Sequence, residues 1–121
     1  MPSTGTYHGY QAGLLVTASV SSAKDRRAWL CLNGDVDLAT SALLDQTVDW
    51  LTAVAPASML IDLAEVTFAG SALPHFVAGV AEALPDGAEL ILWRSSPAAE
   101  VVLRATAMAA ICTVCDDPET P

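Results

Sequence analysis

The chain has 121 residues, of which 53% are apolar and 16% are charged, and its formal net charge is −9. A chain of this length is expected to form one compact domain, and its apolar content excludes an intrinsically disordered protein. Because only five residues are Lys or Arg, a positive surface that follows a phosphate backbone is hard to assemble, and no nucleic acid partner is expected.

The N-terminal sequence MPSTGTYHGYQAG contains neither the basic segment nor the apolar run of a signal peptide. Residues 66–81 form the longest later stretch without acidic or basic residues, which is short for a membrane span. Three cysteines are too few for a secreted disulfide framework. We therefore expect a cytoplasmic protein without a membrane span. The folded domain is expected at residues 13–115, with flexible tails at 1–12 and 116–121.

The first predicted elements are two strands, at residues 14–20 and 29–34, joined by the polar sequence SSAKDRR into a hairpin. From residue 38 the apolar period becomes helical. Asp37 or Thr40 is expected to cap this helix, and Pro56 to stop it.

The second half of the chain alternates between strands and helices. Strands are predicted at residues 58–63, 88–93 and 110–115, and a strand-like run ends at Phe68. Helices are predicted from Ser71 to about residue 84, and after Ser96-Pro97.

The resulting order is β-β-α-β-α-β-α-β, which predicts an α/β fold with a mixed, mainly parallel sheet and helices packed against it. Functional loops of such sheets lie at the carboxyl ends of strands. Two corners occupy such positions, at residues 34–38 and 68–72.

Three segments carry a family resemblance: LNGDVDLATSALL, LIDLAEVTFAGSAL and LILWRSSPAAEVVLRATAMAAICTV. In order and spacing they resemble the STAS domain of anti-sigma factor antagonists, over about residues 14–114. The resemblance implies a STAS-like fold and a regulatory protein-interaction module in bacterial transcription. It also implies docking of the two corners and the second helix onto an anti-sigma factor, often a kinase of the ATPase fold.

The second corner departs from the family pattern. The partner kinase of the family phosphorylates a Ser or Thr at this corner, which adds about −1.5 to −2 charges. A gapless alignment puts Gly70 at the usual Asp, Ser71 at the first hydroxyl and Ala72 at the usual acceptor. Because alanine cannot accept a phosphoryl group, the resemblance implies a module without the usual switch. A one-residue deletion would instead leave Ser71 as the phosphoacceptor, although we favour a helix N-cap role for it.

The other polar residues of the corners also receive structural interpretations. Asp35 and Asp37 have no His or Lys nearby in the sequence to complete an acid–base pair, so turn formation and capping are favoured over catalysis. Asp62 is expected to accept hydrogen bonds from backbone N–H groups of the neighbouring corner, and His75 to lie on the exposed side of its helix. The expected partner-binding residues are Asp35, Asp37, Ser71, Ala72 and His75.

Other function classes have weaker support. Cys112 and Cys115 form a C-x-x-C, so a thiol oxidoreductase is one alternative, but residues three apart in a strand point to opposite faces. No H-E-x-x-H, Gly-rich phosphate loop or G-x-S-x-G occurs, and no enzyme, metal or cofactor is expected. An accessory subunit of a transporter ATPase and a ligand-binding sensor are further alternatives. The sequence does not indicate an oligomeric state.

Overall fold

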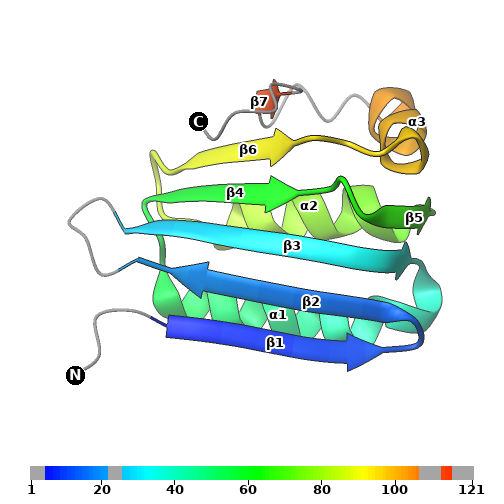
Figure 1. The fold of residues 1–121 in the computed structure, drawn as a ribbon. Helices are drawn as coiled ribbons and strands as arrows, with labels where there is room; N and C mark the ends of the chain where they lie inside the picture. Colours follow the sequence, from blue (N-terminus) through cyan, green and yellow to red (C-terminus); the bar gives the residue numbers. More distant parts are fainter. Residues whose placement is uncertain (1–4, 22–25, 107–112, 116–121) are drawn as a thin grey trace.

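The computed structural model describes residues 5–21, 26–106 and 113–115, and Figure 1 shows their arrangement. The strands are β1 (Gly5–Gln11), β2 (Leu14–Val20), β3 (Arg27–Val36), β4 (Ser58–Asp62), β5 (Val66–Ala69), β6 (Glu89–Trp93) and β7 (Thr113–Cys115). The helices are the 3-10 helix η1 (Leu38–Thr40), α1 (Ser41–Val54), α2 (Ala72–Ala83) and α3 (Pro97–Ala105). None of these described helices is long and apolar enough to cross a membrane.

The described strands form one sheet in the order β1-β2-β3-β4-β6-β7, with β5 paired to β3 outside this path. The pairs β1–β2 and β2–β3 are antiparallel, and the other pairs are parallel. Helices α1 and α2 lie behind the sheet in Figure 1, and α3 lies at its right-hand end. This arrangement confirms the predicted mixed α/β sheet and the hairpin of the second and third strands.

The core lies between the sheet and helices α1 and α2. Strand β2 alternates strictly between buried and exposed residues, as expected for a strand with one face covered. Its inward residues pack with leucines of α1 and with Leu73, Phe76 and Val77 of α2. Each such side chain contributes roughly 1.5–3 kcal/mol through its removal from water.

The opposite face of the sheet carries a small aromatic cluster. Leu60, Ile91 and Trp93 are buried there, and Trp29 packs against them. The rings of Trp29 and Trp93 meet nearly perpendicularly, with centroids 5.3 Å apart, and the guanidinium of Arg94 lies 4.3 Å from the centroid of Trp93. These contacts cover apolar surface on the face that α1 and α2 leave open.

Strand β1 corrects the expectation of a flexible tail over residues 1–12, because residues 5–11 pair with β2 along their whole length. Its inward positions are Gly5, Tyr7, Gly9 and Gln11, which give no apolar alternation in the sequence. Specific contacts with α1 hold the strand instead. Tyr7 stacks on Trp50 with a centroid distance of 5.4 Å, and Gln11 Oε1 accepts a hydrogen bond from the Leu43 N–H at 2.9 Å.

The strand-like run that ends near Phe68 forms β5, which the predicted element order does not count as a strand. Three of its four residues, Val66, Phe68 and Ala69, pair with the last part of β3. The last predicted strand is observed at Thr113–Cys115, while residues 110–112 and the predicted tail at 116–121 lie outside the described residues.

Most predicted helix ends are confirmed. Asp37 and Thr40 form a reciprocal capping box at η1, and Ala55 ends α1 in a left-handed conformation just before Pro56. Ser96 caps α3, with its Oγ 3.2 Å from the Ala99 nitrogen and Pro97 in the first turn.

Candidate functional site

The two corners lie side by side at the end of the sheet where β3 and β5 finish. Asp35 and Val36 at the end of β3 pair with Phe68 and Ala69 of β5. Immediately after this pairing, the Gly70 N–H donates to the Val36 carbonyl at 3.0 Å. Figure 1 shows the end of β3, η1 and the end of β5 close together at the right of the sheet. The predicted juxtaposition of the corners is therefore confirmed.

The ten-residue length of β3 makes this pairing possible. Its first half pairs with β4, and its second half pairs with β5. The register shifts between Gly34 and Asp35, and the Gly34 N–H donates to the Glu65 carbonyl at 3.0 Å. Gly34 has φ +124°, and a Cβ there would lie 2.0 Å from the Gly13 carbonyl oxygen. Only glycine fits this close passage of β3 beside the β1–β2 turn.

Both carboxylates of the first corner make hydrogen bonds within the fold. Asp35 Oδ1 accepts from Thr67 Oγ1 at 2.7 Å, which ties β3 to β5 through side chains as well as backbone. Asp37 Oδ1 accepts from the Ala39 N–H at 2.9 Å. Each carboxylate is half-buried, so its outer surface is available for contact while its orientation is set by these bonds.

Ser71 does not make the capping bond that its sequence position predicts. It precedes α2, is exposed, and has φ −62° and ψ −17°, and its side chain makes no cap hydrogen bond. A capping hydroxyl reaches the first turn when its own backbone is extended, whereas Ser71 is already helical. The turn begins one residue earlier, where the Leu73 N–H bonds to the Gly70 carbonyl at 3.1 Å. Ser71 thus stands at the N-cap position of α2, as predicted, but without the capping hydrogen bond, and its hydroxyl is left at the surface.

Ala72 and His75 border a groove between α1 and α2. Ala72 is only 8% exposed, so it contributes little to a contact surface, whereas His75 is exposed as predicted. The groove has a volume of about 210 Å³ and also contains Leu44, Val48 and Phe76. The residue aligned with the family phosphoacceptor therefore faces this groove, and the neighbouring Ser71 is the more accessible position.

The sequence did not predict two exposed apolar side chains at the corners. Leu38 in η1 is 81% exposed and Phe68 in β5 is 52% exposed. Both residues belong to the corners. Their position beside polar turns was the sequence signal that could have indicated their exposure. We define the corner face as the surface of Asp35, Asp37, Leu38, Phe68, Ser71 and His75.

A second polar cluster lies at the carboxyl ends of β4 and β6. Asp62 is only 5% exposed, and its Oδ1 accepts from the Ala64 N–H at 3.0 Å. It therefore bonds to the backbone, as predicted, but directly after β4 and not in the neighbouring corner. The sequence analysis missed its ion-pair partner, Arg94, whose Nη2 lies 2.5 Å from Asp62 Oδ2. Arg94 follows β6, and its proximity to Asp62 could not be predicted without knowing that β6 lies beside β4 in the sheet.

Cys31 lies opposite Asp62 in the β3–β4 register. Burial raises the pKa of its thiol above the ordinary value, the charges of Asp62 and Glu65 raise it further, and Arg94 partly opposes them. Cys31 is therefore held as a thiol and is poorly suited to nucleophilic or redox chemistry. Cys112 lies outside the described residues, and so does the side chain of Cys115.

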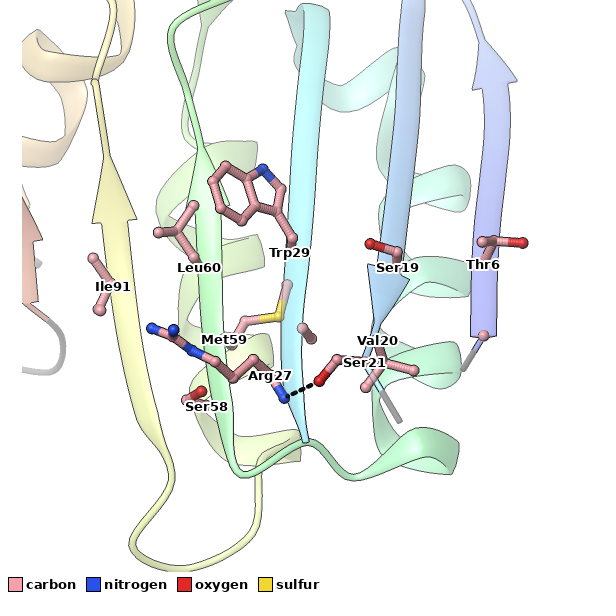
Figure 2. A pocket seen from close by; sticks show the side chains of 12 residues that line it. Thr6, Ser19, Val20, Ser21, Arg27, Trp29, Ser58, Met59, Leu60 and Ile91 are labelled. Atoms are coloured by element: carbon pink, nitrogen blue, oxygen red, sulfur yellow. Dashed lines mark hydrogen bonds between the residues drawn. The ribbon is translucent and has the colours of Figure 1, made fainter. Parts of the chain in front are cut away.

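A hollow of about 350 Å³ lies at the other end of the sheet, among residues of β1, β2, β3, β4 and β6. Figure 2 shows Trp29, Met59, Leu60 and Ile91 around it, with Arg27, Ser21 and Ser58 towards the amino ends of β3 and β4. None of the predicted partner-binding residues lines it. Within the described ranges, no cluster of three or more His, Cys, Asp or Glu residues could hold a metal ion.

No family model matches the chain, and no curated protein matches it. Solved structures do. An anti-sigma factor antagonist from Mycobacterium paratuberculosis superposes with a TM-score of 0.71 at 19% identity, covering 98% of this chain and 91% of that one. The anti-sigma factor antagonist SpoIIAA, in its unphosphorylated form, gives a TM-score of 0.65 at 13% identity, with 93% and 90% covered. The chain thus has the STAS-like fold of the anti-sigma factor antagonists.

Proposed function

We propose that this protein is a regulatory module that binds an anti-sigma factor through the corner face and has no catalytic role. The observation that carries the proposal is the pairing of β5 with the end of β3, which brings Leu38 and Phe68 to one edge of the sheet. The similarity in fold to anti-sigma factor antagonists supports the class of partner.

The exposed apolar side chains have a physical role in such docking. Leu38 and Phe68 lose no intramolecular contact when a partner covers them, and their transfer out of water favours association. Around them, Asp35 and Asp37 are already oriented by hydrogen bonds to Thr67 and Ala39. Polar groups oriented in advance cost less side-chain entropy on binding. The partner is expected to present an apolar patch bordered by basic residues.

We further propose that the module works without a phosphoacceptor at residue 72. Ala72 has no hydroxyl, and its position is nearly buried against the groove between α1 and α2. Ser71 is the remaining candidate at this corner, because its hydroxyl is exposed and makes no cap hydrogen bond. A phosphate there would place negative charge at the start of α2, next to the apolar side chains.

Binding to the ATPase-fold anti-sigma factors of the same organism tests the proposed partner and face. Leu38→Glu and Phe68→Glu are each expected to weaken binding at least tenfold, measured by titration calorimetry. Ala57→Glu is the control of matched charge, because Ala57 is exposed and precedes β4, at the opposite end of the strands from the corner face. Equal binding by all three variants would reject the corner face, and absence of binding by the wild-type protein would reject the partner class.

Incubation with the bound anti-sigma factor and ATP, followed by intact mass measurement, tests the switch. An unmodified protein would support constitutive binding. A single added phosphate that disappears in Ser71→Ala, but remains in Thr67→Val, would identify Ser71 as the acceptor and contradict the absence of a switch. The Ser71→Glu variant then shows whether negative charge at this position weakens the complex.

A further inference from the structure

Strand β1 is the edge of the sheet, and within the described part of the chain β2 is its only strand partner. Its outer side therefore presents backbone N–H and C=O groups that no strand of the described residues satisfies. Seven residues make this edge long enough to act as a template for another strand. Figure 1 shows β1 at the border of the sheet with nothing described beyond it.

The β1–β2 turn determines which backbone groups point outward. Gln11 and Leu14 are paired across a two-residue loop, and the loop residues Ala12 and Gly13 have φ values of +48° and +91°. This is a hairpin of the type I′ class, in which the closing pair is hydrogen-bonded. Because antiparallel pairs alternate between bonded and non-bonded, Thr6, His8 and Tyr10 direct their N–H and C=O groups to the free edge.

We propose that two copies of this chain form a symmetric dimer through their β1 strands. The outward-pointing residues are spaced evenly about His8, so an antiparallel second copy can pair all of them in one register. His8 then lies opposite His8 of the second copy, and Thr6 lies opposite Tyr10 of the second copy. Each of these is a bonded pair with two hydrogen bonds. A two-fold axis through His8 gives the closed interface usual in homodimers.

The composition of this edge favours a second copy. Soluble proteins protect exposed edge strands with charged residues or proline. The sequence GTYHGYQ contains no proline and none of the 14 acidic or 5 basic residues of the chain. For a chain with a net charge of −9, an edge without acidic side chains is a region where two copies can approach without direct repulsion.

The adjoining flank of α1 is also uncharged. Trp50 stacks on Tyr7, so the side of α1 that carries Trp50 lies beside β1. Residues spaced by three or four positions share a helix face, and those next to Trp50 on its outer side are Gln46 and Ala53. The nearest acidic residue, Asp49, borders the groove between α1 and α2 instead. In the proposed dimer this flank is directed towards the second copy, so the uncharged surface extends beyond the strand itself.

The experiment is sedimentation equilibrium of the full chain over a range of concentrations. The wild-type protein is expected to dimerise. His8→Pro is expected to raise the dissociation constant at least tenfold, because proline removes an outward N–H and no bond to β2. His8→Val keeps the backbone donor and is expected to remain dimeric. A monomeric wild-type protein, or a His8→Pro dimer as tight as the wild type, would overturn the proposal.

A charge exchange tests the register and does not depend on the folding of the proline variant. Thr6→Lys with Tyr10→Lys places like charges directly opposite each other and should abolish the dimer. Thr6→Lys with Tyr10→Glu places opposite charges at the same pairs and should restore it, with a dissociation constant that rises with salt. Equal association by both double variants would reject this register. Capture of an extended peptide at β1 by a protein that stays monomeric would show a different occupant and reject the second copy.

Discussion

The backbone N–H of Gly70 donates to the carbonyl oxygen of Val36 at 3.0 Å, so the residue before the helical turn of Ser71 is held by the end of β3. The start of α2 and the start of η1 therefore belong to one rigid corner, although more than thirty residues separate them in sequence. Side chains from both segments can contact a partner without paying the entropy of ordering two independent loops.

Gly34→Ala is expected to destabilise the protein by at least about 2 kcal/mol, because it combines a left-handed backbone with a backbone clash. The Cβ would lie 2.0 Å from the Gly13 carbonyl oxygen. The matched control is Gly87→Ala, where φ is +82° but nothing lies within 4 Å of the added atom, so only the conformational cost of about 1 kcal/mol remains. Urea denaturation measures both. Equal losses would show that the β1–β2 turn yields to the added methyl group.

Arg94→Met should lower the free energy of unfolding, because it leaves the buried carboxylate of Asp62 without its ion-pair partner. Arg104→Met is the comparison, since it breaks the ion pair with Glu100 between two exposed side chains and should change stability by less than about 0.5 kcal/mol. Thermal unfolding of both variants at neutral pH gives the ranking. If the two losses are alike, the Asp62–Arg94 pair is no more important than a surface pair.

Cys31 should react slowly with iodoacetamide at neutral pH, because burial, Asp62 and Glu65 raise the pKa of its thiol and the thiolate is the reactive form. Asp62→Asn removes one of these charges, so the midpoint of the pH–rate profile is expected to fall. Cys112→Ser and Cys115→Ser in both proteins leave Cys31 as the only thiol. An unchanged midpoint would show that the charge of Asp62 does not contribute to the shift.

The same raised pKa has a consequence for stability. The folded protein holds the Cys31 proton more tightly than the unfolded chain, so this contribution is complete below the thiol's ordinary value of 9.0 and is lost as the pH rises through the folded pKa. Urea denaturation between neutral and alkaline pH should show a shallower decline in Cys31→Ala than in the protein that keeps this thiol. Parallel declines would contradict the shift.

Two alanines in left-handed conformations offer stabilising substitutions. Ala12 and Ala55 have φ values of +48° and +46°, which cost an L-residue roughly 1–2 kcal/mol. Ala12→Asn creates the Asn-Gly sequence preferred in a type I′ turn, and Ala55→Gly creates the usual glycine at the end of α1. Each should raise the free energy of unfolding by about 0.5–1 kcal/mol. Ala53→Gly, inside the helix, should lower it by roughly 1 kcal/mol.

The elements that were predicted correctly are those whose signals are local. The helical spacing from Leu44 to Leu51 and the serine–proline start of α3 both depend on residues within one or two turns. Strand β1 lacked such a signal, because Tyr7 and Gln11 are held by Trp50 and Leu43 of α1. The capping bond at Ser71 is absent for a different reason, because the backbone of this serine is already helical and its residue type does not indicate that.

By itself, the sequence determined the order of the helices and of the strands other than β1 and β5, the lack of charge in residues 5–11 and the absence of a hydroxyl at residue 72, because these follow from residue type and short-range spacing. Only the tertiary structure decided that β5 pairs with the end of β3, that Arg94 meets Asp62, and that Leu38 and Phe68 remain exposed on the corner face. The physical reason is that sheet order and burial result from contacts between distant segments. The apolar period along the chain indicates which face of a helix or strand is buried, but it does not indicate which other element covers that face.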